Sequence, residues 1–327
     1  MNLCIKSPTR VDLAGGTLDL WPIYTIVRPA MTINCSIDIY TQVEVDTSHK
    51  SGVFVQVSDL KYEKNFSNYT EFMSCTDSPV ELIQCVAKEF GDIGTYRIKT
   101  SSQSPVGGGL GGSSSLMISM IKAYSQMTGK TLSLNEQVLL AQNMEARILN
   151  KPTGCQDYFP AANVGMNKIS LTDLGPKTEF LDFDESFFNS HFFLVDTGKA
   201  HNSGINNWDV YKAVIEGHRG VLKALHQVKD VTLRLNEVLL KKKYNELPEI
   251  FNHEFEARVQ LADCFSSPEI EQLREIALGS GGLAVKICGA GGGGCVLVMA
   301  PPEKKQKVMI ECQQHQFHPI EIKFLKH

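Results

Sequence analysis

A stretch of glycine and serine in the first half constrains this chain more than any other segment. Residues 104–115 read SPVGGGLGGSSS, with glycine at positions 107–109, 111 and 112. Glycine lets a backbone approach a ligand closely and adopt positive φ without steric cost. The serines that follow open a segment with the apolar spacing of a helix, whose N-terminus offers unpaired N–H groups and a positive dipole end. The stretch therefore predicts a binding loop for an anion, most simply a chain of phosphates.

The composition limits the class of protein. The 327 residues are 43% hydrophobic and 21% charged, which is typical of a globular protein with more than one domain. The formal net charge of −4 argues against nucleic acid as a partner, because nucleic-acid-binding proteins usually carry a basic excess. No segment approaches the ~18 apolar residues of a membrane helix, and residues 1–16 lack the apolar region of a signal peptide. We therefore expect no membrane partner, a cytoplasmic location and reduced thiols for the nine scattered cysteines.

Two domains are predicted, covering residues 1–185 and 186–327, with the acidic and aromatic segment 182–190 as their linker. The first hundred residues alternate apolar and polar side chains, which is the pattern of strands, and helical spacing follows the glycine stretch. In the second half the pattern predicts a strand and then three long helices within 203–278. A strand, a glycine turn and another strand are expected over 284–299, before a final helix and strand.

Several generic motifs fail to account for the sequence. The dinucleotide-binding spacing GxGxxG occurs twice, at glycines 107, 109 and 112 and at glycines 289, 291 and 294. The first cluster has no acidic residue about twenty positions on, and the second is followed by a predicted strand instead of a helix. A P-loop needs a lysine that neither cluster has. His253 and Glu254 begin like the zinc motif HExxH, but Ala257 stands where the second histidine is required.

Three segments resemble, in order, the motifs of the GHMP kinases, which include galactokinase, homoserine kinase, mevalonate kinase and phosphomevalonate kinase. They are TRVDLAGGTLD (9–19), PVGGGLGGSSS (105–115) and KICGAGGGGC (286–295). The resemblance runs from near residue 1 to about residue 300. It implies an α+β fold, with an N-terminal domain like the second domain of ribosomal protein S5 and a C-terminal ferredoxin-like domain. A left-handed βαβ crossover is part of that expectation, although general rules favour the right-handed form.

The resemblance assigns the middle segment to the phosphates of ATP. The residues expected to hold them are Gly107, Gly108, Gly109, Gly111, Gly112, Ser113 and Ser114. It also implies that Ser113 and Glu145, on the following helix, hold Mg²⁺. A hydroxyl in the first turn of a helix can bind a hard cation while free N–H groups hold phosphate oxygens. Without the motif, simple helix capping by the serines and a surface ion pair of Glu145 are the alternatives.

Two further residues match the catalytic positions of the sugar-kinase branch. Asp157, in GCQDYFPAA, matches the catalytic aspartate, and Arg10 matches the basic residue of the first motif. A carboxylate can orient the acceptor hydroxyl and take its proton late in phosphoryl transfer. A guanidinium beside it would keep that carboxylate ionised and stabilise charge on the transferred group. Taken alone, an aspartate in such a loop could equally be a turn residue.

The acceptor site is expected at Gly16, Thr17 and Asp19. Asp19 matches the acid that binds sugar hydroxyls in galactokinase-like members, but galactokinase carries Glu-His where this chain has Gly16 and Thr17. The difference argues against galactose, and the segment is similar to that of heptose-phosphate kinases and some fucose- or arabinose-type kinases. Lys199 and His201 follow a predicted strand and could bind a phosphate on the acceptor.

The third segment predicts a tight turn at Gly289, Gly291 and Gly292, which in the family supports the phosphate loop. Together the motifs predict an ATP- and Mg²⁺-dependent kinase that phosphorylates a hydroxyl, expected at the anomeric carbon, of a sugar or sugar phosphate. The protein would act as a monomer or homodimer. A kinase of a mevalonate-like hydroxy acid is one alternative, although that branch usually has lysine in place of Arg10. A non-catalytic protein that binds ATP and a sugar is the other.

Overall fold

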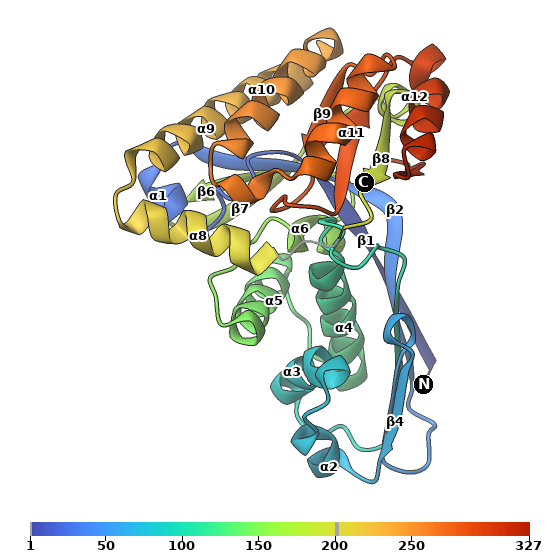
Figure 1. Cartoon of the computed structure of the whole chain (residues 1–327). Coiled ribbons are helices and arrows are strands. Elements are labelled where there is room, and N and C mark those ends of the chain that lie inside the picture. The colour runs from blue at the N-terminus through green and yellow to red at the C-terminus, as the bar shows by residue number, and fades with distance from the viewer. Residues whose placement is uncertain (1, 200–202) are drawn as a thin grey trace.

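Two β-sheets with helices packed against them form the two halves of the molecule (Figure 1). The computed structural model describes residues 2–199 and 203–327, apart from the side chains of residues 203–206. A seven-stranded sheet belongs to the first half and a four-stranded antiparallel sheet to the second. Within the described residues, the helices are too short or too polar to cross a membrane. All nine cysteines are free thiols.

The larger sheet is built around two long strands. β1 (Asn2–Ala14) pairs antiparallel with β2 (Ala30–Asp46) along almost its whole length. The opposite edge of β2 is shared, because residues 30–35 pair with β6 and residues 41–46 pair with β5. β3 and β5 pair parallel, across a connection that contains two helices. The other strands of this sheet are β3 (Val53–Val57), β4 (Tyr62–Phe66), β5 (Tyr96–Ser102), β6 (Met166–Thr172) and β7 (Gly175–Phe180).

Helix α4 (Gly112–Thr128) follows the glycine stretch directly, as predicted, and packs against both β1 and β2. Between Met117 and Tyr124 nearly all its side chains are buried, and Gly129 ends it in the left-handed conformation. A helix buried to this extent is a rigid support for the loop at its N-terminus. The remaining helices of the first half are α1 (Ile23–Ile26), α2 (Tyr69–Ser74), α3 (Glu81–Phe90), α5 (Leu134–Leu149) and α6 (Tyr158–Ala162).

The second half contains the smaller sheet, in the strand order β11-β8-β10-β9. Within the described residues four α-helices, rather than the predicted three, lie between β8 and β9. Its strands are β8 (Phe192–Asp196), β9 (Ala284–Ile287), β10 (Cys295–Met299) and β11 (His318–Ile320). Its helices are α7 (Glu185–His191), α8 (Ser203–Ile215), α9 (Arg219–Leu240), α10 (Leu247–Val259), α11 (Pro268–Gly279) and α12 (Pro302–Gln314).

The segment 182–190, which the sequence suggests as a linker, is itself folded. It contains most of α7, which is capped by Asp184, and it buries Phe183 and Phe188. These rings belong to a hydrophobic cluster that also includes Val11 of β1 and Leu297 of β10. The two halves therefore share a core, which holds β1 at a defined position relative to the smaller sheet.

Candidate active site

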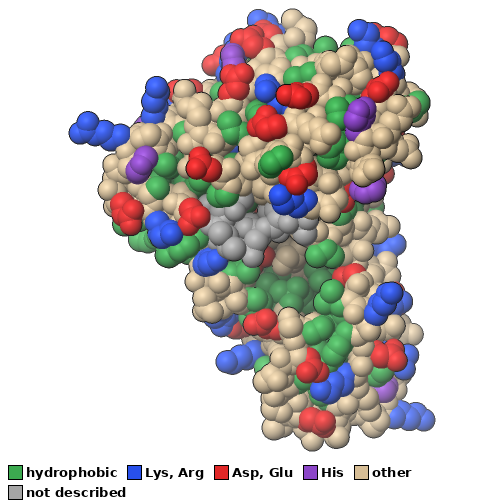
Figure 2. Space-filling view, in the orientation of Figure 1, with side chains coloured by type: hydrophobic (Ala, Val, Ile, Leu, Met, Phe, Trp, Pro, Cys, Tyr) green, Lys and Arg blue, Asp and Glu red, His purple; other side chains and the backbone are tan. Residues whose placement is uncertain are grey.

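A cavity of about 370 Å³ lies where the two halves meet. Most of its lining comes from β1 and the loop after it, the glycine loop, the first turn of α4, the end of α5, the loop 152–158 and the turn at Gly289 and Ala290. Figure 2 shows a hollow at this junction with hydrophobic side chains on its floor. Leu82, Val106, Leu116 and Leu149 supply apolar lining to the cavity. The apolar part suits a flat aromatic group, and the polar part described below suits a phosphate chain.

The glycine loop adopts the conformation that its composition predicts. Gly107, Gly109 and Gly111 have φ of 66°, 71° and 70°, in the left-handed region that side chains disfavour. Gly111 is the N-cap of α4, so the N–H groups of the first turn lie beside the cavity at the positive end of the helix dipole. An anion in the cavity would therefore meet both backbone donors and a favourable dipole.

The third glycine motif lies against this loop. The N–H of Cys295 donates to the carbonyl oxygen of Gly108 at 2.8 Å. A Cβ at Gly294 would lie 2.6 Å from the Gly107 oxygen, and one at Gly289 would lie 3.0 Å from the Gly109 oxygen. Only glycine permits backbones to approach this closely. A turn from the second half thus supports the loop of the first.

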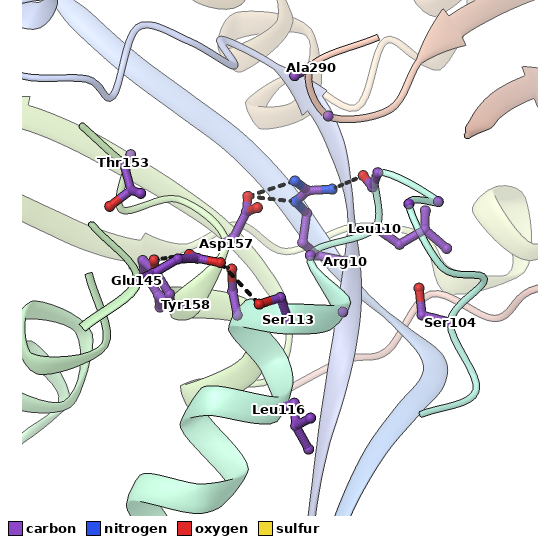
Figure 3. A pocket seen from close by; sticks show the side chains of 18 of the residues that line it. Arg10, Ser104, Leu110, Ser113, Leu116, Glu145, Thr153, Asp157, Tyr158 and Ala290 are labelled. Carbon is purple, nitrogen blue, oxygen red and sulfur yellow. Dashed lines mark hydrogen bonds and ion pairs between the residues drawn. The ribbon is translucent and has the colours of Figure 1, made fainter. Parts of the chain in front are cut away.

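Arg10 and Asp157 form an ion pair beside the glycine loop (Figure 3). The Arg10 Nε and Nη2 atoms lie 2.9 and 2.6 Å from the same Asp157 oxygen, Oδ1, and Nη1 donates to the Gly109 carbonyl at 2.5 Å. Within the described part of the chain, Asp157 Oδ2 makes no hydrogen bond, so it can accept one from a ligand. Burial would lower the pKa of Arg10, but the carboxylates of Asp157 and Asp12 raise it overall, and the guanidinium stays charged.

Glu145, on α5, lies opposite the start of α4 and accepts three hydroxyl hydrogen bonds. Ser113 Oγ and Ser114 Oγ donate to it at 3.1 and 3.2 Å, and the Tyr158 hydroxyl makes a short contact with the same carboxylate. Burial raises the pKa of Glu145 despite the Tyr158 hydrogen bond, and no Lys or Arg of the described chain pairs with it. A carboxylate without a counter-charge beside two hydroxyls is an oxygen set that suits a hard cation such as Mg²⁺.

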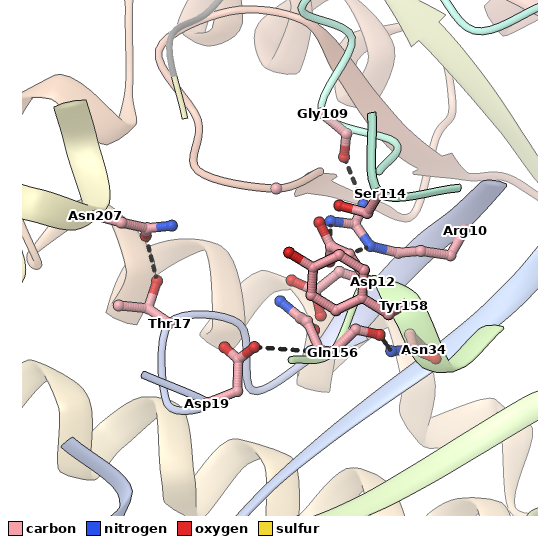
Figure 4. A network of polar contacts seen from close by, with 12 residues as sticks. Arg10, Asp12, Thr17, Asp19, Asn34, Gly109, Ser114, Gln156, Tyr158 and Asn207 are labelled. Atoms are coloured by element: carbon pink, nitrogen blue, oxygen red, sulfur yellow. Dashed lines mark hydrogen bonds and ion pairs between the residues drawn. The ribbon is translucent and has the colours of Figure 1, made fainter. Parts of the chain in front are cut away.

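Asp19 and Thr17 line another part of the cavity (Figure 4). Asp19 is 3% exposed, and its Oδ2 accepts from the backbone N–H of Gln156 at 2.9 Å. Burial raises the pKa of Asp19 to about 6, although that N–H opposes the shift. Thr17 donates to Asn207 Oδ1 at 3.2 Å and has a φ of 74°, a strained value for a β-branched residue.

Gly154 explains how the loop 152–158 reaches Asp19. A Cβ at Gly154 would lie 1.9 Å from Asp19 Oδ2, so a side chain there would push the loop away. The glycine of GCQDYFPAA therefore serves the contact with Asp19 and, three residues on, the placement of Asp157. The glycine is visible in the sequence, but its role becomes clear only once the loop 152–158 is known to contact Asp19.

Not every predicted residue lies in the cavity lining. Gly16 lies in the loop 15–19, which we call the acceptor loop after the role expected of Asp19, and it packs against Asp12 and Arg258. Gly291 and Gly292 pack near Phe265. Lys199 is paired with Glu269 at 3.1 Å and does not line the cavity, and His201 lies outside the described residues. Three residues that the sequence does not predict, Gln156, Tyr158 and Asn207, also line the cavity. Gln156 and Tyr158 flank Asp157 in its motif, but the motif assigns a role to the aspartate alone, and no motif surrounds Asn207.

Two family models match the chain. The description "GHMP kinases N terminal domain" matches residues 78–165, and "GHMP kinases C terminal" matches residues 240–315, which together make up half of the chain. The chain belongs to the GHMP kinase family. It is therefore a phosphotransferase, and the glycine loop falls within the first matched region.

Individual relatives agree with this assignment over nearly the whole length. The D-glycero-alpha-D-manno-heptose 7-phosphate kinase of Campylobacter jejuni is 22% identical, with 98% of this chain and 96% of that protein covered. A mevalonate kinase of Thermococcus onnurineus is 24% identical, with 94% of this chain and 92% of that protein covered. The crystal structure of a D-glycero-D-manno-heptose 1-phosphate kinase from Bacteroides thetaiotaomicron superposes with a TM-score of 0.80 at 20% identity, covering 100% of this chain and 97% of that one. At this identity the structural match establishes the fold.

Proposed function

We propose that this GHMP kinase transfers the γ-phosphoryl group of ATP to a hydroxyl, at the anomeric carbon, of a sugar or sugar phosphate. The observation that carries the proposal is the Arg10–Asp157 pair, which lies between the glycine loop and Asp19 with Asp157 Oδ2 unengaged among the described residues. A donor phosphate on the loop and an acceptor hydroxyl near Asp19 would both lie next to this pair. The leucine and valine side chains of the cavity would contact the adenine.

The residues divide the chemistry between them. Asp157 would hold the acceptor hydroxyl in line with the γ-phosphorus and accept its proton as the bond forms. Arg10 holds Asp157 in place through their ion pair and would stabilise the negative charge of the phosphoryl group during its transfer. The first turn of α4 would hold the β- and γ-phosphate oxygens through backbone N–H groups.

The described residues fit a magnesium ion bound together with the nucleotide. Ser113 Oγ and the Glu145 carboxylate would hold it, and Mg²⁺ typically takes one or two carboxylates with phosphate oxygens supplying other ligands. Among the described residues no cluster of three or more His, Cys, Asp or Glu side chains forms a metal site from protein alone. When bound, the ion would neutralise charge on the β- and γ-phosphates.

A sugar-type acceptor is favoured over a mevalonate-like hydroxy acid by the charge around Asp19. Asp19 and Asp157 both face this part of the cavity, and the pKa of Asp19 is raised by burial with further repulsion from Asp157. Arg10 is already paired, so a carboxylate on the acceptor would add a third negative charge to this region. The ring hydroxyls of a sugar or of a sugar phosphate are neutral, and they can donate hydrogen bonds to Asp19.

We also infer the finer fold assignment from the topology. The order β11-β8-β10-β9, with helices after β8 and after β10, supports a ferredoxin-like C-terminal domain. The parallel pair of β3 and β5 across α2 and α3 supports an N-terminal domain like that of ribosomal protein S5. Domains of residues 1–185 and 186–327, a monomeric or homodimeric state and a cytoplasmic location remain parts of this proposal.

The decisive test is ADP release from MgATP with a panel of acceptors: neutral aldoses, heptose phosphates and mevalonate. We expect turnover with a sugar or sugar phosphate and none with mevalonate, and magnetic coupling between phosphorus and the anomeric proton of the product would identify the position. Asp157→Asn is the matched inactive control. Turnover with mevalonate alone would refute the acceptor class, and tight ATP binding with no acceptor-dependent ADP release would favour a non-catalytic binder.

A further inference from the structure

Four charged side chains form a buried cluster that the proposed mechanism does not use. Asp12 lies on β1, Glu254 and Arg258 on α10, and Lys286 on β9, and each side chain is at most 1% exposed. Arg258 Nη2 lies 3.2 Å from Asp12 Oδ2 and 2.6 Å from Glu254 Oε1. Lys286 Nζ lies 3.3 and 3.4 Å from the same two oxygens. The cluster therefore joins the two halves of the molecule through two opposed charge pairs.

Stability alone does not account for this cluster. Removing four charges from water carries a large desolvation cost, and apolar replacements of buried ion clusters are often as stable. Asp12 Oδ1 and Glu254 Oε2 have no hydrogen-bond partner among the described residues, so the network is not fully satisfied. Burial opposes charge on Asp12, but Lys286 and Arg258 lower its pKa overall, which keeps the carboxylate ionised. Because the cluster is costly to bury and lies at the junction of the two halves, a role in positioning the residues of the cavity would account for it.

Arg258 contacts two parts of the chain that hold Arg10 in place, the glycine turn at Gly289 and strand β1. Its Nη1 donates to the carbonyl of Gly289 at 3.3 Å, and Gly289 packs against the backbone of Gly109. The Gly109 carbonyl in turn accepts from Arg10. Asp12, another partner of Arg258, is two residues from Arg10 on β1, on the same face of the strand. Arg258 thus ties the glycine turn and β1 together on either side of the Arg10 guanidinium.

The acceptor loop lies directly on the same cluster. A Cβ at Gly16 would lie 2.5 Å from Asp12 Oδ2 and 2.8 Å from Arg258 Nη2. Gly16 is followed by Thr17, which lines the cavity in a strained conformation. The glycine therefore places the loop against Arg258, which explains a glycine at this position without any contact to the acceptor.

We propose that Arg258 is a positioning residue that sets the glycine turn, Arg10 and the acceptor loop in register across the junction of the two halves. It does not line the cavity, so it acts through Asp12, Gly289 and Gly16. This inference rests on the proposed function where kcat is measured, because turnover requires a kinase reaction. The measurement of MgATP binding does not depend on the acceptor. If the proposal is right, substitutions of Arg258 and of Asp12 lower kcat and weaken nucleotide binding non-additively, beyond any loss of stability.

The test compares Arg258→Lys, Asp12→Asn and the double variant with the unmodified protein. Lysine keeps the positive charge but cannot reach Asp12, Glu254 and the Gly289 carbonyl together. We expect kcat to fall about 10–100-fold in each single variant at a temperature well below its Tm, because small misplacements of reacting groups cost this much. The Kd for MgATP, measured by calorimetry without acceptor, should rise several-fold. The double variant should be little worse than either single one, since both remove the same contact.

Arg274→Lys is the matched control, because Arg274 is a partly exposed residue of α11 that pairs with Glu256 away from the cavity. It should leave kcat and Kd unchanged. If Arg258→Lys does not fold, Gly16→Ala tests the same cluster without replacing a charged side chain, and the same loss of kcat is expected. A lowered Tm with kcat and Kd within about twofold of the unmodified protein, or additive losses in the double variant, would overturn the proposal. Absence of MgATP binding in the unmodified protein would instead refute the proposed function.

Discussion

Replacement of Asp19 by asparagine should make the protein more stable while it impairs acceptor binding. Asp19 is 3% exposed and has no cationic partner within the described residues, and burial raises its pKa from 3.8 to about 6. Folding therefore opposes ionisation of this carboxyl at neutral pH. The asparagine side chain in Asp19→Asn would keep an acceptor oxygen for the N–H of Gln156, which now donates to Asp19 at 2.9 Å.

The size and sign of the effect follow from the two pKa values. A pKa that rises from 3.8 to about 6 on folding corresponds to about 3 kcal/mol, at about 1.4 kcal/mol per unit. The folded protein holds the proton more tightly, so this penalty is absent below about pH 4 and complete above about pH 6. Asp19→Asn should raise the free energy of unfolding by up to about 3 kcal/mol at about pH 8 and change it little at about pH 3.5.

The assay is urea unfolding of both proteins at several pH values between about 3.5 and 8. Asp230→Asn, which alters a carboxylate that is 67% exposed on α9, is the control and should change stability little at any pH. The KM for the acceptor should rise about tenfold or more in Asp19→Asn, because a charged hydrogen-bond acceptor is lost. Equal stability of Asp19→Asn and the unmodified protein at about pH 8 would contradict the argument from burial.

Three further predictions concern catalysis and nucleotide binding. Asp157→Asn should bind MgATP with unchanged affinity in calorimetry but lose about 10²–10⁴-fold in kcat, and unchanged turnover would remove Asp157 from the mechanism. Tyr158→Phe should raise the Mg²⁺ concentration required for nucleotide binding about tenfold, since a hydroxyl that orients Glu145 is lost; an identical Mg²⁺ titration would speak against this role. Gly294→Ala should weaken ATP binding, because its φ of 70° and the 2.6 Å approach to the Gly107 oxygen exclude a side chain. For that variant, a nucleotide Kd equal to that of the unmodified protein would count against the supporting role of the turn.

Much of the fold near the site can be predicted from local patterns. The glycine loop, α4 with its stop at Gly129, and the strand–turn–strand around Gly289 lie where the sequence indicates, because each is defined by glycine conformation and short-range periodicity. The prediction of three helices in 203–278 is wrong, since four amphipathic helices in sequence differ little in pattern from three longer ones. The segment 182–190 lies between the two sheets but is folded, because its acidic residues flank two phenylalanines that become buried in the shared core.

The motifs predict the catalytic candidates, and the structure adds how they meet. Arg10 and Asp157 are 147 positions apart, and no local pattern states that they share a hydrogen bond. Tyr158 gives no signal in the sequence, because a tyrosine after an aspartate has the pattern of an ordinary core residue. Arg258 and Glu254 are hidden for a similar reason, because charges at helical spacing normally indicate a solvated surface, whereas here both are fully buried.

The sequence by itself determined where a phosphate-binding loop is expected. The glycines within 107–112 permit the backbone shape and the serines after them begin the helix, and both properties belong to the residues themselves. The tertiary structure decided what surrounds that loop. The shared core brings β1, the loop 152–158 and the turn from the second half to one cavity, and only there do Asp19 and Arg258 lose contact with water. Burial and pairing with distant residues set the charge and position of Asp19 and Arg258. Neither burial nor such pairing follows from the local sequence, because the residues involved are far apart along the chain.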